Sequence, residues 1–115
     1  VDTEKSGPLF VIRGMVTSKY PQNRRYIMIK GSILDNKGVV VLSKTAYAGN
    51  TFSEEELKTL PLEEIIKAAD NRDGMVKQNL NIASGATIPF MVVFAALPDD
   101  LSEFTVEAVG SSSGG

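Results

Sequence analysis

Hydrophobic and polar residues alternate with a period of two along much of the chain, a pattern typical of β-strands with one buried face. The most apolar run covers residues 88–94 and is rich in Val, Ile and Phe. It is too short to cross a bilayer and suits a buried strand. Because a second alternating run follows at residues 101–109, after a turn at residues 98–100, we interpret residues 88–94 as the central strand of a sheet.

Three further strands are predicted earlier, at residues 9–18, about 25–35 and 39–47. Residues 35–38, Asp-Asn-Lys-Gly, join the last two of them and favour a hairpin turn with positive φ at Gly38. In the strand before this turn, alternate isoleucines are expected to face the core. They are Ile27, Ile29 and Ile33.

The pattern changes after residue 50, where two short helices are predicted. Ser53 and Glu56 have the spacing of a capping box, and Phe52 and Leu57 have that of a hydrophobic staple. The second helix follows Pro61, and its apolar residues recur at i, i+3, i+4 and i+7, which predicts one buried stripe. The stripe contains Leu62, Ile65, Ile66 and Ala69.

The order of elements predicts a mainly β fold, an immunoglobulin-like antiparallel β-sandwich with a two-helix insertion at about residues 53–70. A short strand is expected at residues 78–83, where apolar and polar residues alternate again. Strand–helix–strand units do not recur, so a parallel doubly wound sheet is not expected. Residues 1–8 are expected to be a linker or disordered, residues 9–110 the domain and residues 111–115 a flexible tail. The core is expected to contain Ile29, Ile33, Phe90, Val92 and Phe104.

The composition restricts the chemistry that the chain can perform. Its 115 residues are enough for one domain with a hydrophobic core. A net charge of -2 argues against binding to nucleic acid, which favours a basic face. Because the chain has no His and no Cys, it lacks the commonest general base and the usual ligands of zinc, and calcium is the only plausible metal ion. We therefore expect no catalytic residues, no metal, no cofactor and no enzymatic activity.

Several short motifs resemble, in their order and spacing, a bacterial family of unknown function whose domain is related to FxLYD-type immunoglobulin-like domains. This chain departs from the FxLYD motif at two positions, because it has Gly31 and Leu34 where the motif has Phe and Tyr. The resemblance implies a domain that follows an N-terminal zinc ribbon and one transmembrane helix, and that lies on the extracytoplasmic side of a bacterial membrane. It implies no catalytic residues. The motifs at residues 14–18 and 31–38 resemble the FxLYD-type domains, and those at residues 47–50, 55–57, 88–94, 97–98 and 103–107 resemble the family of unknown function.

The first candidate site combines basic and aromatic residues around the loop between the first two strands. Tyr20, Arg24 and Arg25 lie there together with Lys19 and Tyr26. Arginine forks suit carboxylate or phosphate groups, and tyrosine rings can stack on a bound group. One interpretation is a site for an anionic partner. The other is a solvated loop, since loops are commonly polar.

The second candidate site is the turn that enters the first helix. Tyr47 and Asn50 would line a groove between the sheet and the helices. Gly49 and Asn50 also tolerate positive φ, so a sharp turn that docks the helices explains the same residues.

The acidic groups have structural interpretations. Residues 70–74, Asp-Asn-Arg-Asp-Gly, superficially suggest calcium, but they lack the bidentate Glu of an EF-hand and are typical of a turn that ends a helix. The glutamates at positions 54–56 and 63–64 fall in the first turns of the predicted helices, where the helix dipole stabilises them. Paired catalytic carboxylates are therefore not expected.

Several strands carry apolar residues on both faces, which a simple sandwich does not require. Either the helices or another chain must cover the second face. We expect a non-enzymatic interaction or sensor domain that binds a protein partner or self-associates, with membrane contact only through a segment outside this chain. The alternative is a small-ligand module with a pocket between sheet and helices. Because the chain begins with Val1, we expect an excised piece of a longer protein.

Overall fold

The computed structural model describes residues 2–3, 7–95 and 101–113. The strands are β1 (Asp2–Thr3), β2 (Gly7–Thr17), β3 (Arg24–Asp35), β4 (Val40–Tyr47), β5 (Thr87–Ala95) and β6 (Leu101–Ser113). The helices are α1 (Glu54–Thr59), α2 (Leu62–Ala69) and the single 3₁₀ turn η1 (Met75–Lys77).

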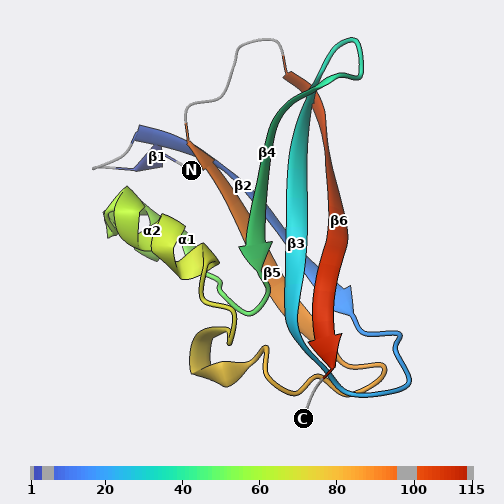
Figure 1. Ribbon diagram of the computed structural model, residues 1–115. Helices are drawn as coiled ribbons and strands as arrows, with labels where there is room; N and C mark the ends of the chain where they lie inside the picture. The colour runs from blue at the N-terminus through green and yellow to red at the C-terminus, as the bar shows by residue number, and fades with distance from the viewer. Residues whose placement is uncertain (1, 4–6, 96–100, 114–115) are drawn as a thin grey trace.

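Two antiparallel sheets pack face to face, with strand orders β1-β2-β5 and β4-β3-β6. The helices α1 and α2 lie on the far side of the β2–β5 pair, so the molecule has three layers (Figure 1). This arrangement confirms the mainly β antiparallel sandwich with a two-helix insertion. It also gives β2 and β5 two partners, one sheet on their inner face and the helices on their outer face.

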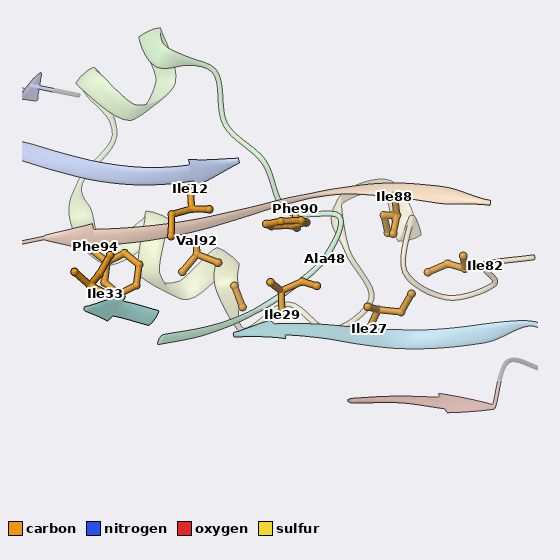
Figure 2. Packing of buried hydrophobic residues seen from close by; sticks show 11 residues of the cluster. Ile12, Ile27, Ile29, Ile33, Ala48, Ile82, Ile88, Phe90, Val92 and Phe94 are labelled. Atoms are coloured by element: carbon orange, nitrogen blue, oxygen red, sulfur yellow. The ribbon is translucent and has the colours of Figure 1, made fainter. Parts of the chain in front are cut away.

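The main core fills the space between the sheets. Phe90 and Val92 of β5 point toward Ile29 of β3 (Figure 2), and Val92 is only 1% exposed. These positions were expected in the core. Phe104 was expected there too, but it is 51% exposed. The β1-β2-β5 sheet has only two long strands, whereas the β4-β3-β6 sheet has three, so the inner face of β6 is left largely uncovered.

A second, smaller core lies between the helices and the outer face of β2 and β5. Leu57 of α1 and Ile65 of α2 pack there against Leu9 and Met91. This packing explains why both strands are apolar on both faces. The predicted stripe of α2 is narrower than expected, because Ile66 is exposed while Ile65 alone is fully inserted.

Local signals placed the helix start and the hairpin correctly. The Ser53 hydroxyl accepts a hydrogen bond from the Glu56 amide, and the Glu56 carboxylate accepts one from the Ser53 amide, which completes the capping box. In the hairpin, the Asp35 carboxylate accepts hydrogen bonds from the amides of Lys37 and Val39. Gly38 has φ 78° there, as expected.

Two strand assignments were wrong. The run at residues 88–94 is not a central strand, because β5 pairs only with β2 in the described part of the chain. Residues 78–83 do not form a strand; a single bridge joins Ile82 to Arg24. The cause is Asn79, whose buried side chain bonds to the backbone of β3 and so takes the place of regular strand pairing.

Both ends of the domain carry more strand than expected. Residues 2–3 pair with Gly7 and Pro8, so the expected linker at residues 1–8 contributes to a sheet where it is described. The prediction of a flexible tail at residues 111–115 is wrong for the residues up to Ser113, because Arg24 and Arg25 pair with residues 112–113 of β6. Residues 1, 4–6, 96–100 and 114–115, including the expected turn at 98–100, lie outside the described residues.

Candidate functional site

The predicted basic and aromatic cluster divides into two units on opposite sides of β3. In the first, the Arg24 guanidinium lies over the Tyr20 ring, with Cζ 4.1 Å from the ring centroid. Arg24 also donates to the Ser111 hydroxyl at 2.9 Å and to the Ser111 carbonyl at 3.0 Å. These hydrogen bonds hold the end of β6 against β3, so the charged side chain of Arg24 has a structural role.

The second unit is centred on Tyr26 and contains an arginine that the sequence did not indicate. The guanidinium of Arg25 lies 4.8 Å from the centroid of the Tyr26 ring, and that of Arg72 lies 4.9 Å from it. Arg72 comes from the turn after α2, far from β3 in the sequence. No short sequence motif predicts this contact, because it depends on how the turn docks onto β3.

Asn79 fixes the backbone under this unit. Tyr26 has φ 56°, a left-handed conformation that a tyrosine rarely adopts. Its amide donates to the Asn79 carbonyl at 2.8 Å. The fully buried Asn79 side chain accepts from the Ile27 amide at 2.9 Å and donates to the Ile27 carbonyl at 3.0 Å. The turn that carries Arg72 and the bulge that carries Tyr26 are thereby held together.

The second predicted pair, Tyr47 and Asn50, does not line one groove. Asn50 is buried, and its amide donates to the carbonyls of Tyr47 and Asn71 at 3.2 and 2.7 Å. The Asn71 side chain returns a hydrogen bond to Asn50 at 3.1 Å. Asn50 is therefore engaged in holding the turn. Tyr47 pairs with Met28 on the opposite, outer face of the sheet, beside Tyr26 and Arg72.

The space between the sheet and the helices is small. The cavity beside Phe52, Ile65 and Met91 has a volume of about 20 Å³, which is close to that of one water molecule. A ligand pocket of several hundred Å³ would be needed for a small-molecule site under the helices. The alternative function expected from the sequence therefore finds no room at the place where it was expected.

The open side of the sandwich, between β2 and β6, exposes apolar side chains of both strands. We call it the seam and define it by Phe10, Met15 and Val16 of β2 and Phe104, Val106 and Ala108 of β6. The Phe10 and Phe104 rings meet edge to face at 5.9 Å and close one end of the seam. Met15 is 61% exposed and Val106 is 41% exposed. Two grooves of about 160 and 180 Å³ run along the seam.

Both strands that border the seam have an unpaired edge. In the described part of the chain, β6 pairs only with β3, and residues 10–17 of β2 pair only with β5. Unpaired strand edges present free backbone N–H and C=O groups that can accept a further strand. The seam therefore combines exposed apolar side chains with two available backbone edges.

Two other functional classes have no site in the described residues. Across residues 7–95 and 101–113, acidic side chains do not gather in groups of three or more that could hold a metal ion. Residues 70–74 form the expected turn at the end of α2, with Gly74 donating to the Asn71 carbonyl. No helix in the described part of the chain is long and apolar enough to cross a bilayer.

Comparison with known proteins identifies a family but no individual relative. Neither the curated proteins nor the solved structures gave a match. A family model described as "Protein of unknown function (DUF3426)" matches residues 1–108, which include every helix and nearly every strand described above. The chain therefore belongs to the DUF3426 family of proteins of unknown function.

Proposed function

We propose that this domain is a non-enzymatic interaction or sensor domain that binds an extended segment of a protein partner in the seam. The observation that carries the proposal is the position of two unpaired strand edges beside one exposed apolar groove. An added strand can form backbone hydrogen bonds with such an edge and place alternate side chains in the groove.

The side chains along the seam support this mode of binding. The inner face of β6 presents Phe104, Val106 and Ala108 at every second position, because these residues pair with Ile33, Gly31 and Ile29. An incoming strand with apolar residues at every second position would match that spacing. Burying a residue such as Val106 against a partner contributes on the order of 1 kcal/mol, and several such contacts are needed for specific binding.

The charged residues at the two edges fit a surface that is kept soluble until a partner arrives. Glu103 and Glu107 lie on the outer face of β6, and Arg13 lies on the outer face of β2. Charged residues beside an edge strand hinder indiscriminate pairing between edges. They leave the apolar inner face free for a partner that supplies the correct strand.

The membrane location is part of the proposal and rests on the resemblance described above. In this proposal a segment outside the chain anchors the domain to a bacterial membrane, and the domain lies on the extracytoplasmic side. The lack of His and Cys supports a binding function rather than catalysis. Accessibility of an introduced surface cysteine, for example Thr45→Cys in the full-length protein, to a membrane-impermeant thiol reagent in intact cells would test the location.

Site-specific photocrosslinking in living cells tests the binding function. A photoreactive phenylalanine analogue would replace Met15 or Val106 in the seam, and Thr45 or Thr105 on the outer face as matched controls. These two threonines are exposed and pair with Lys30 and Ser32, so they point away from the seam. We expect an adduct of defined mass from the seam positions and none from the controls.

Light scattering over a range of protein concentrations separates the two classes of partner. A domain that stays monomeric and still crosslinks at the seam has a different protein as its partner. A domain that dimerises, and whose adduct has twice its own mass, binds a second copy of itself. Equal crosslinking from seam and outer-face positions, or none from the seam, would contradict the proposed function.

A further inference from the structure

We propose that a hollow on the outer face of the β4-β3-β6 sheet, centred on Tyr26, binds the acidic group of a sugar unit. The hollow has a volume of about 300 Å³ and lies beside the last residue of β4, Tyr47, and the C-terminal part of β6. It lies on the outer face of β6, although Gly110 and Ser111 also line the 180 Å³ groove of the seam. Its lining residues are Tyr26, Met28, Tyr47, Arg72, Gly110 and Ser112, with Ser111 at the margin.

The register of the sheet builds the floor of the hollow. Met28 pairs with Tyr47 on one side and with Gly110 on the other, so these three positions share the outer face. A Cβ atom added at Gly110 would meet no atom within 4 Å. The missing side chain at position 110 therefore leaves the space open between the Tyr47 ring and the end of β6.

The charge of the hollow is positive and is not neutralised by the protein. The guanidiniums of Arg25 and Arg72 both lie within 5 Å of the centroid of the Tyr26 ring. Neither forms an ion pair within residues 7–95 and 101–113. Arg72 lines the hollow, whereas Arg25 lies beside Tyr26 but outside the lining. The exposed guanidinium of Arg72 is therefore the group that is available to an acidic ligand.

The backbone around the hollow is held in a conformation that a tyrosine adopts only when its surroundings require it. Tyr26 has φ 56°, and its amide is fixed by the carbonyl of Asn79. Strained residues of this kind cluster at binding sites, where they set the position of a side chain before the ligand arrives. Asn79 is a positioning residue in this sense, because it joins the strand of Tyr26 to the turn of Arg72.

The lining chemistry selects the class of ligand. A guanidinium fork binds carboxylate or phosphate groups in a bidentate manner. Tyrosine rings offer flat apolar faces with a polar tip, and the serine side chain at position 112 offers a hydroxyl that both donates and accepts. A volume of about 300 Å³ lies at the lower end of the range of small-ligand sites, so the hollow has room for one ring and its acidic group. A monosaccharide unit that carries a carboxylate or a phosphate combines all of these features.

Titrations followed by NMR of the ¹⁵N-labelled chain test the site. The probes are glucuronate for the carboxylate, glucose 6-phosphate for the phosphate, and glucose as the uncharged control. We expect one or both acidic sugars to give saturable shifts at the amides of Tyr26, Tyr47 and Gly110 at concentrations below about 10 mM, and glucose to give none. The probe that binds more tightly identifies the acidic group.

Three variants give the matched comparison. Arg72→Ala removes one exposed guanidinium, and Gly110→Leu adds a side chain at a position where a Cβ atom meets nothing within 4 Å; each should weaken binding at least tenfold. Arg13→Ala removes an exposed arginine from β2 and should leave binding unchanged. The inference is overturned if neither acidic sugar gives saturable shifts, if glucose binds equally well, or if Arg72→Ala and Gly110→Leu bind as the unmodified chain does. Loss of crosslinking at the seam would not affect this result.

Discussion

The side chain of Asn79 pairs with Ile27 as a neighbouring strand would. Its Oδ1 atom accepts the Ile27 amide at 2.9 Å, and its Nδ2 atom donates to the Ile27 carbonyl at 3.0 Å. The same Nδ2 atom donates to the Ala48 carbonyl at 3.1 Å. One buried amide thus satisfies three backbone groups from β3 and from the turn after β4. It allows β3 to bulge at Tyr26 without leaving unpaired polar groups in the core.

The first prediction concerns Asn79→Ala. The substitution leaves the Ile27 amide, the Ile27 carbonyl and the Ala48 carbonyl without partners in a buried site. Each unsatisfied group costs about 1–3 kcal/mol, and partial entry of water reduces the sum, so we expect a loss of about 2–4 kcal/mol in the free energy of unfolding. Urea denaturation followed by circular dichroism measures it.

Asn81→Ala is the matched control for this prediction. Asn81 accepts a hydrogen bond from Asn23 at 2.7 Å, but this bond is exposed. Its loss should change the free energy of unfolding by less than about 0.5 kcal/mol. If Asn79→Ala behaved like this control, the three buried hydrogen bonds would not carry the stability assigned to them.

The second prediction compares two glycines with nearly equal positive φ. Gly38 has φ 78° and Gly74 has φ 75°. At Gly74 this φ is combined with ψ 159°, a region that is essentially restricted to glycine, so an alanine there is strained by about 1–3 kcal/mol. An added Cβ meets nothing within 4 Å at Gly38, whereas at Gly74 it lies 3.0 Å from the backbone nitrogen of Asn79. We expect Gly74→Ala to be less stable than Gly38→Ala by a further 1–3 kcal/mol or so, because backbone atoms must move.

Thermal or urea unfolding of the two alanine variants side by side gives the difference directly. The ψ of 159° at Gly74 and the steric contact with Asn79 both contribute to this difference. Equal stability of Gly38→Ala and Gly74→Ala would show that the turn at residue 74 can relax away from Asn79.

The features that were predictable from sequence are those whose causes lie within a few residues. Ser53 and Glu56 define the start of α1 because both partners of the capping box belong to the same turn. The Asp35 carboxylate defines the hairpin for the same reason. The alternation of apolar and polar residues predicted Phe90 and Val92 in the core, because every second side chain of a β-strand points to the same face of the sheet.

The features that sequence reasoning missed depend on which distant segments meet. Phe104 has the pattern of a core residue, but its exposure is decided by the number of strands in the opposite sheet. Arg72 joins Tyr26 only because Asn79 docks the intervening turn onto β3. Asn79 itself looks like an ordinary polar loop residue, since its three hydrogen bonds all go to backbone groups from other elements.

The third prediction concerns the cap of α1. Ser53→Ala removes the hydroxyl that accepts the Glu56 amide at 3.1 Å and breaks the capping box. We expect a loss of about 1 kcal/mol, with faster hydrogen exchange at the amides of α1. Ser84→Ala is the control, because Ser84 is also an exposed serine but lies in the turn before β5 and makes no side-chain hydrogen bond there. Unchanged exchange in α1 after Ser53→Ala would mean that packing of Leu57 alone holds the helix.

The last prediction tests whether the seam is open in solution. Val92 and Val106 have the same side chain, but Val92 is 1% exposed and Val106 is 41% exposed. Val92→Ala removes two buried methyl groups and leaves a cavity, so we expect it to lower the free energy of unfolding by about 2–3 kcal/mol. Val106→Ala should lower it by less than about 1 kcal/mol, because its side chain already contacts water.

Both values should be measured at two protein concentrations at least tenfold apart. A large cost for Val106→Ala that grows with protein concentration would mean that a second copy covers the seam, since the stability of a dimer depends on concentration. A large cost that is independent of concentration would mean that the two sheets close over the seam within one chain, and the partner-binding proposal would then lose its surface.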